Sequence, residues 1–150
     1  MPGRLIPALL LPFLAALPAA LPAALPAGAS EPALRVEPLA AARADLSDLK
    51  WQKRPVLIFA PSAGDPDLRR QTALFDAAAA GLADRNIVVL ADTDPAAGGK
   101  LRAELGASGF TLVLVGLDGG VKLESREPLS PESLFATIDR MPMRRNETGN

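Results

Sequence analysis

Three short runs of apolar residues dominate the hydrophobic pattern of the chain beyond its first fifty residues. The runs are Val56–Ala60, Ile87–Ala91 and Thr111–Val115, and β-branched side chains are frequent in them. Apolar runs of this length without alternation are typical of strands buried on both faces of a sheet. A fourth segment, Val121–Ser125, alternates apolar and polar residues, which predicts a strand with one exposed face. The turn signal Asp118–Gly120 predicts a hairpin between the last two strands.

Apolar residues at helical spacing follow three of these segments. Asp65 is suited to cap a helix that begins after the first strand and is ended by Asp84–Asn86. The apolar face of this helix is formed by Leu68, Phe75 and Leu82. A shorter helix is predicted over Lys100–Leu105, and Ser130 is suited to cap a last helix.

The predicted order of elements is βαβ, a connecting helix, a β-hairpin and a final helix. A parallel βαβ unit needs a right-handed crossover, and the antiparallel hairpin extends the same sheet. The sequence therefore predicts an α/β fold with a mixed four-stranded sheet (βαβ-α-ββα) flanked by helices. This is the thioredoxin-like arrangement, although other small α/β folds share parts of it.

The amino-terminal segment has the pattern of a secretory signal peptide. One basic residue, Arg4, precedes the apolar stretch Leu5–Ala27, and small residues follow up to Ala29. We expect cleavage after Ala29 and hence a periplasmic location in a bacterium. The alternative is an uncleaved membrane anchor, which the stretch is long enough to form. Prolines at helical spacing oppose this alternative, because each one removes a helix hydrogen bond. They are Pro18, Pro22 and Pro26.

The chain is thus divided into a signal peptide (1–29), a lead-in segment (30–50), a thioredoxin-like domain (51–142) and a polar tail (143–150). The lead-in is rich in alanine and proline, so we expect it to be extended, with a short helix from Pro38. We expect the polar tail to be frayed. Once the signal peptide is removed, no membrane span is predicted.

Composition excludes several kinds of function. The chain contains no cysteine and no histidine, and its formal net charge is −1. Without cysteine, thiol–disulfide exchange is excluded. Without histidine, the commonest general base and the commonest transition-metal ligand are missing. No cofactor or metal motif is present in the sequence, and acidic and basic residues are too evenly mixed to form a nucleic-acid-binding patch.

The segment from Phe59 to Pro66 resembles the strand–turn–helix of thioredoxins, in which two cysteines open the helix. Ala63 and Pro66 stand roughly where these cysteines would be. Thioredoxins also have a cis-proline before the third core strand, where this chain reads Gly109–Thr111. The resemblance therefore implies the fold without its usual redox chemistry.

Four stretches resemble a family of bacterial exported proteins known as domain of unknown function 4174. They are Trp51–Arg54, Leu57–Ser62, Gly116–Leu123 and Met141–Arg145. The resemblance extends over about the whole mature domain, and the first and third stretches are its most specific parts. It implies a thioredoxin-like fold and export, and it implies no activity.

The turn after the first strand is the candidate ligand site. The candidate residues are Ser62, Gly64, Asp65 and Phe110. Ligands in α/β folds favour the carboxyl ends of strands, and free backbone N–H groups at a helix start attract anions. An ordinary capped helix start explains the same residues. Nearby, we interpret Asp92 and Asp94 as a solvated turn, because two acids are too few to hold a calcium ion.

Trp51 and Arg54 form a candidate partner-binding edge, because tryptophan and arginine are enriched in interaction hot spots. The alternative is that Trp51 packs over the sheet while the neighbouring basic side chains stay in water.

These observations favour a non-catalytic exported module that binds a protein or a small ligand in the bacterial envelope. The sequence predicts no cofactor and no nucleic-acid partner, and it identifies neither ligand nor protein partner. One alternative is a cysteine-independent enzyme that uses Asp, Lys or Ser groups at the strand–turn–helix cleft, in which Ser62 would need Lys53 or Lys100 as its base. Another is an envelope protein that acts by forming oligomers.

Overall fold

A computed structural model of the chain describes residues 32–149. The expected signal peptide, with its cleavage after Ala29, lies outside the described residues. From residue 32 to residue 149, no helix combines the length and the apolar character needed to cross a bilayer.

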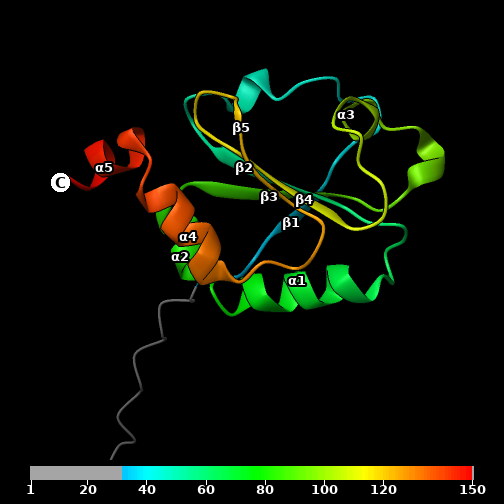
Figure 1. Cartoon of the computed structure of the whole chain (residues 1–150), viewed down its shortest axis with the longest axis horizontal. Coiled ribbons are helices and arrows are strands. Elements are labelled where there is room, and N and C mark those ends of the chain that lie inside the picture. The colour runs from blue at the N-terminus through cyan, green and yellow to red at the C-terminus, as the bar shows by residue number, and fades with distance from the viewer. Residues whose placement is uncertain (1–31, 150) are drawn as a thin grey trace, which may run out of the picture.

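The centre of the structure is a twisted sheet with the strand order β1-β3-β2-β4-β5 (Figure 1). The strands are β1 (Val36–Pro38), β2 (Arg54–Phe59), β3 (Ile87–Asp92), β4 (Thr111–Val115) and β5 (Val121–Ser125). The first three pair in parallel, whereas β4 pairs antiparallel with both β2 and β5. The mixed sheet is as predicted, but it has five strands instead of four.

The additional strand, β1, comes from the lead-in, where we expected a short helix from Pro38. That expectation is wrong. Val36–Pro38 pairs with Val89–Ala91 of β3, and the next backbone N–H, that of Leu39, donates to Ala91 O at 2.8 Å. Three residues ending in proline give no strand pattern of their own, so this strand forms because β3 offers an unpaired edge.

Residues 32–149 form five helices. They are α1 (Pro66–Asp76), α2 (Ala79–Asp84), α3 (Lys100–Glu104), α4 (Pro131–Asp139) and α5 (Pro142–Thr148), with 3₁₀ turns at Ser47–Leu49 and Pro95–Ala97. The single helix predicted to end at Asp84–Asn86 does end there, but it is broken after Asp76. The break redirects α2, so that Leu82 still faces the core while Gly81 packs closely against Phe135 of α4.

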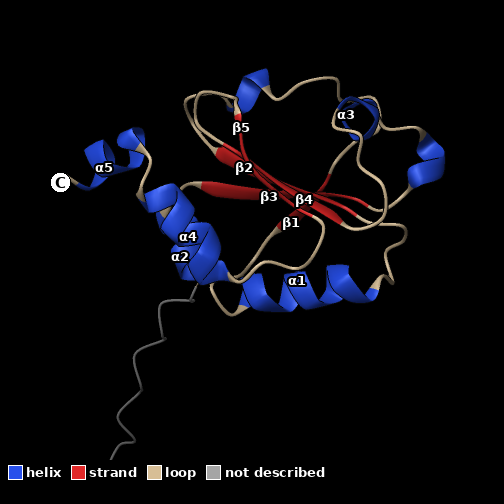
Figure 2. Ribbon diagram, in the orientation of Figure 1, coloured by secondary structure: helices blue, strands red, loops and turns tan. Residues whose placement is uncertain are grey.

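The apolar core consists of two layers, one on each face of the sheet. Helices α1, α2 and α4 cover one face, and α3 covers the other (Figure 2). Along β2, Val56 and Ile58 point into the first layer, whereas Leu57 and Phe59 point into the second. Burial on both faces explains the unbroken apolar run of this strand, as the pattern predicted.

The carboxyl-terminal tail is not frayed, in contrast to our expectation. It forms α5, which an ionic cluster ties to the start of β2. Arg54 donates to the carboxylate of Glu147 at 3.0 and 3.2 Å, and Arg144 donates to Glu147 and to Asp84. Burial opposes the ionisation of Glu147, but hydrogen bonds and attraction from Arg54 and Arg144 hold its pKa below the ordinary value. The tail is ordered because it neutralises a buried arginine.

We expect Glu147→Gln to destabilise the protein by on the order of 3 kcal/mol, because it leaves the Arg54 guanidinium buried without a counter-charge. The side chain of Arg54 is only 1% exposed. The measurement is urea unfolding at neutral pH. The control is Asp48→Asn, which removes a solvent-exposed partner of Arg43 and should cost less than about 1 kcal/mol. Equal losses for the two variants would contradict this role of Glu147.

Candidate functional site

The candidate ligand residues all lie at the carboxyl end of β2, as expected, but they differ in how exposed they are. Ser62 and Gly64 are exposed. The carboxylate of Asp65 accepts a hydrogen bond from the N–H of Leu68 at 3.0 Å and so caps α1, as predicted. Phe110 lies at the same end of the sheet, but its ring is buried in the core with Leu68. The turn therefore offers a polar surface without an accessible aromatic ring.

A buried ion pair lies behind this turn, between Asp92 at the end of β3 and Arg102 on α3. Arg102 Nε donates to Asp92 Oδ2 at 2.9 Å, and Arg102 Nη2 donates to the carbonyl oxygens of Asp92 and Ala60 at 2.9 and 3.0 Å. The backbone of Gly99 approaches so closely that a Cβ there would be 2.9 Å from Asp92 Oδ2. Our interpretation of Asp92 as part of a solvated turn is wrong, because Arg102 covers it.

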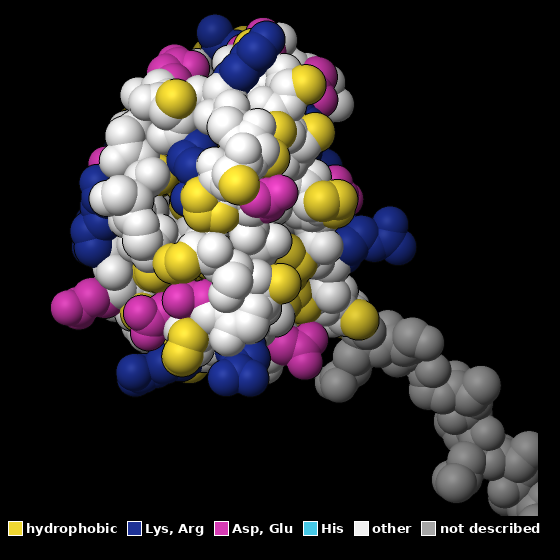
Figure 3. Space-filling view, turned by 90° about the vertical axis from the view of Figure 1, so that its right-hand side faces the viewer, with side chains coloured by type: hydrophobic (Ala, Val, Ile, Leu, Met, Phe, Trp, Pro, Cys, Tyr) yellow, Lys and Arg dark blue, Asp and Glu magenta, His cyan; other side chains and the backbone are white. Residues whose placement is uncertain are grey.

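Because of this pair, the polar groups of Asp92 and Arg102 are already engaged at the carboxyl end of β2. Burial raises the pKa of Asp92, but hydrogen bonds from Arg102 and from the N–H of Asp94, with the charge of Arg102, hold it below its ordinary value. Asp92 is therefore an ionised partner of Arg102, with both of its oxygens occupied. Figure 3 views this side of the molecule, where acidic and basic side chains are mixed without a patch of one sign.

Trp51 and Arg54 lie at the opposite end of β2 and have contrasting environments. The side chain of Trp51 is 63% exposed, whereas Arg54 is fully buried. The alternative in which Trp51 packs over the sheet while the bases stay in water is therefore wrong for Trp51 and for Arg54, although Lys53 is exposed. Trp51 has a left-handed backbone (φ 65°), and its N–H donates to Leu117 O at 2.7 Å. This bond fastens the start of β2 to the β4–β5 hairpin.

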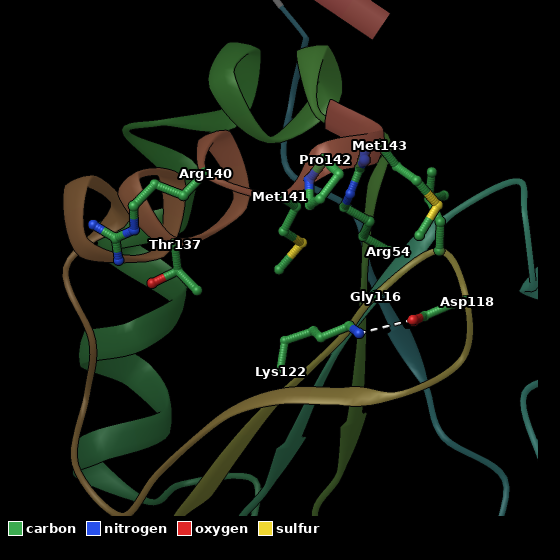
Figure 4. A pocket seen from close by; sticks show the side chains of 10 residues that line it. Arg54, Gly116, Asp118, Lys122, Thr137, Arg140, Met141, Pro142 and Met143 are labelled. Carbon is green, nitrogen blue, oxygen red and sulfur yellow. Dashed lines mark hydrogen bonds and ion pairs between the residues drawn. The ribbon is translucent and has the colours of Figure 1, made fainter. Parts of the chain in front are cut away.

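A cleft of about 510 Å³ opens at this amino end of β2. Figure 4 shows that its walls come from the start of β2, the β4–β5 hairpin and the link between α4 and α5. The charged or polar residues that line it are Arg54, Asp118, Lys122, Thr137 and Arg140. The remaining lining residues are Gly116, Leu117, Met141, Pro142 and Met143. The cleft thus combines basic groups with an apolar wall.

Lys122 crosses the floor of the cleft and pairs with Asp118, at 2.8 Å between Nζ and Oδ2. Hydrogen bonds from Lys122 and from the N–H of Gly120 hold the pKa of Asp118 below its ordinary value. Gly116 is required for this arrangement, because a Cβ at that position would be 2.6 Å from Lys122 Cε. Lys122 therefore lies in a fixed position along the backbone of the hairpin.

Sequence reasoning placed no site residue in the cleft except Arg54, and it assigned that residue to an exposed edge. One signal could have found the cleft. Three of the four stretches that carry the family resemblance, Trp51–Arg54, Gly116–Leu123 and Met141–Arg145, each contribute lining residues to it. They are far apart in the sequence, so only the fold reveals that they meet.

We expect the Asp92–Arg102 pair to contribute stability that is lost in acid. Because the pKa of Asp92 is lowered by folding, its contribution is present above the ordinary value of 3.8 and disappears as the pH falls below it. Asp92→Asn should therefore be less stable than the native chain at pH 7, and the difference should shrink near pH 3. Urea unfolding at the two pH values measures it.

The matched control for this prediction is Asp94→Asn, which alters an exposed carboxylate whose one hydrogen bond within residues 32–149 comes from the N–H of Ala96. Its effect on the free energy of unfolding should be small at both pH values. A deficit of Asp92→Asn that stays constant from pH 7 to pH 3 would show that ionisation of Asp92 does not contribute.

Comparison with solved structures identifies the fold. The chain is similar to the reduced 2-Cys peroxiredoxin of Plasmodium vivax, with a TM-score of 0.52 and 16% identity over 69% of this chain and 84% of that one. It is also similar to reduced desulfothioredoxin from Desulfovibrio vulgaris Hildenborough, with a TM-score of 0.50 and 19% identity over 70% and 97% of the two chains. At these identities the likeness concerns the fold alone, and the predicted thioredoxin-like fold is confirmed.

Among curated proteins, no sequence matches the chain significantly. A family model does match, and it covers residues 45–147, which is more than half of the chain. Its description is a domain of unknown function, DUF4174. The resemblance noted from the four stretches is thereby confirmed, and this chain belongs to the DUF4174 family.

Proposed function

We propose that the protein is a non-redox binding module with a thioredoxin-like fold, which is exported to the bacterial envelope and holds a small ligand. The cleft at the amino end of β2 is the observation that carries this proposal. Its volume of about 510 Å³ lies within the range of small-molecule sites. Its lining also has the usual character of such sites, a mainly apolar wall with a few polar groups.

The enzyme alternative has less support from the geometry of the described residues. Lys53 immediately precedes β2 and Ser62 follows it, so the six residues of the strand hold them roughly 20 Å apart. Lys53 therefore cannot serve as a base for Ser62. Asp65 is engaged as a helix cap, and Asp92 is engaged by Arg102.

The other surfaces identified from the sequence are secondary candidates. The turn at Ser62, Gly64 and Asp65 is exposed or half-exposed. Arg102, the buried arginine behind this turn, is paired with Asp92 and is therefore not free to attract a ligand. Trp51 is accessible to a protein partner, whereas Arg54 is not. Partner binding at Trp51 stays a prediction.

Export is tested by the mass of the mature protein. We expect the full chain, expressed in a bacterium, to be recovered from the periplasm with Ser30 as its first residue, because the segment before it has the order of a cleavable signal. Intact-mass spectrometry of the periplasmic fraction measures this. Retention of the uncleaved chain in the membrane or the cytoplasm would contradict the proposal of export.

Ligand binding at the cleft is tested with three eight-carbon probes, octanol, octanoate and octylammonium, by NMR of the ¹⁵N-labelled domain from residue 30. We expect at least one probe to shift the amide signals of Gly116, Leu117 and Lys122. Met143→Trp, which fills the cleft, should abolish the shifts, and Ser62→Trp, at the other end of β2, should leave them unchanged. Absence of binding by all three probes, or loss only in Ser62→Trp, would contradict the assignment of the cleft.

A further inference from the structure

The cleft has an excess of positive charge among its lining side chains. Arg54, Lys122 and Arg140 contribute cations, and Asp118 is the one acidic group among the lining residues of the described chain. Arg140 is exposed at the rim, and between residues 32 and 149 it makes no ion pair. Glu147 neutralises Arg54 from outside the cleft, so Lys122 and Arg140 are the cations that a ligand meets first.

One nitrogen of the Arg54 guanidinium makes no hydrogen bond with the described residues. Nη1 of Arg54 donates to Arg85 O at 2.9 Å, and Nη1 and Nη2 donate to Glu147. Its Nε is buried and has no partner among the described residues. A buried donor without an acceptor destabilises the fold, so such a group normally has a partner in the working protein. The vacant donor belongs to a residue that lines the cleft.

The opposite wall is apolar and adaptable. It is formed by Leu117, Met141, Pro142 and Met143. Methionine side chains are unbranched and flexible, so they can shift to admit a ligand and then pack along an aliphatic chain. Met141 and Met143 are both half-buried and lie beside Arg54 in Figure 4. A ligand that entered between them would reach the arginine at its inner end.

We propose that the cleft binds a small amphipathic carboxylate, with its head at Arg54 and Lys122 and its aliphatic body against Met141 and Met143. One carboxylate oxygen would accept from Arg54 Nε, and the other would accept from Lys122 Nζ. The lysine keeps two further hydrogens for this purpose besides the one it gives to Asp118. This inference rests on the proposed function, because it names the ligand class of the same cleft.

A neutral ligand would leave the charges of Lys122 and Arg140 without compensation beyond Asp118, and a cationic ligand would be repelled by them. A polar ligand without an aliphatic part would leave the methionine wall exposed to water. The combination of a vacant donor, an excess of cations over acids in the lining and an apolar wall therefore selects a single negative charge on an apolar body.

The test is isothermal titration calorimetry of the domain from residue 30 with octanoate, octanol and octylammonium. We expect octanoate to bind at least tenfold more tightly than octanol, and octylammonium to bind most weakly. Lys122→Met removes the charge but keeps an apolar stem, so it should weaken octanoate about tenfold and leave octanol nearly unchanged. The matched control is Lys100→Met, an exposed lysine of α3 outside the cleft, which should change neither affinity.

The NMR signal of Arg54 tests the proposed hydrogen bond to the carboxylate directly. On addition of octanoate, the NMR signal of its Nε–H should shift downfield as the donor gains an acceptor, and octanol should move it much less. The two variants used in the calorimetry are at exposed positions, so that loss of folding does not obscure the result.

The outcomes separate this inference from the proposed function. Octanol that binds in the cleft as tightly as octanoate overturns the carboxylate assignment but leaves the cleft a binding site. Preference for octylammonium, or an unchanged octanoate affinity in Lys122→Met, also overturns it. Failure of all three probes to bind would overturn the proposed function together with this inference.

Discussion

Complete burial of the central strand β2 is the constraint on which the rest of the structure depends. All six of its residues are buried, it pairs with β3 and β4, and apolar layers cover both of its faces. Arginine is costly to bury, yet one guanidinium lies at each end of this strand. Arg54 opens it, and Arg102 donates a hydrogen bond to the carbonyl oxygen of Ala60, the residue that follows the strand. Each arginine is tolerated because a carboxylate compensates its charge.

The two ends of β2 differ in what their buried arginines contact. At the carboxyl end, where thioredoxins have their cysteines, Arg102 and Asp92 satisfy one another. At the amino end, the ionic cluster around Arg54 holds α5 in place and so positions the link that forms the methionine wall of the cleft. The proposed ligand site is therefore at the end of the sheet opposite the usual redox site.

Several elements were predictable because their signals are local. The core strands follow from unbroken apolar runs, and the caps at Asp65 and Ser130 follow from residues adjacent to the helices they start. Strand β1 was missed because its pairing depends on the free edge of β3. The sequence did not reveal that the tail forms the helix α5, because Glu147 pairs with an arginine 93 positions earlier in the chain. From the sequence alone, a polar segment is predicted to lie in solvent, because its distant partners are not known.

The sequence by itself determined what chemistry is absent and which strands must be buried. Absence of cysteine excludes thiol exchange in any fold, and apolar runs require burial wherever the strands are placed. Only the tertiary structure decided that Arg54 is buried, that Asp92 is covered, and that three separate stretches enclose one cleft. The physical reason is that charge compensation and cavity shape depend on contacts between residues far apart in the chain, which only the path of the backbone brings together.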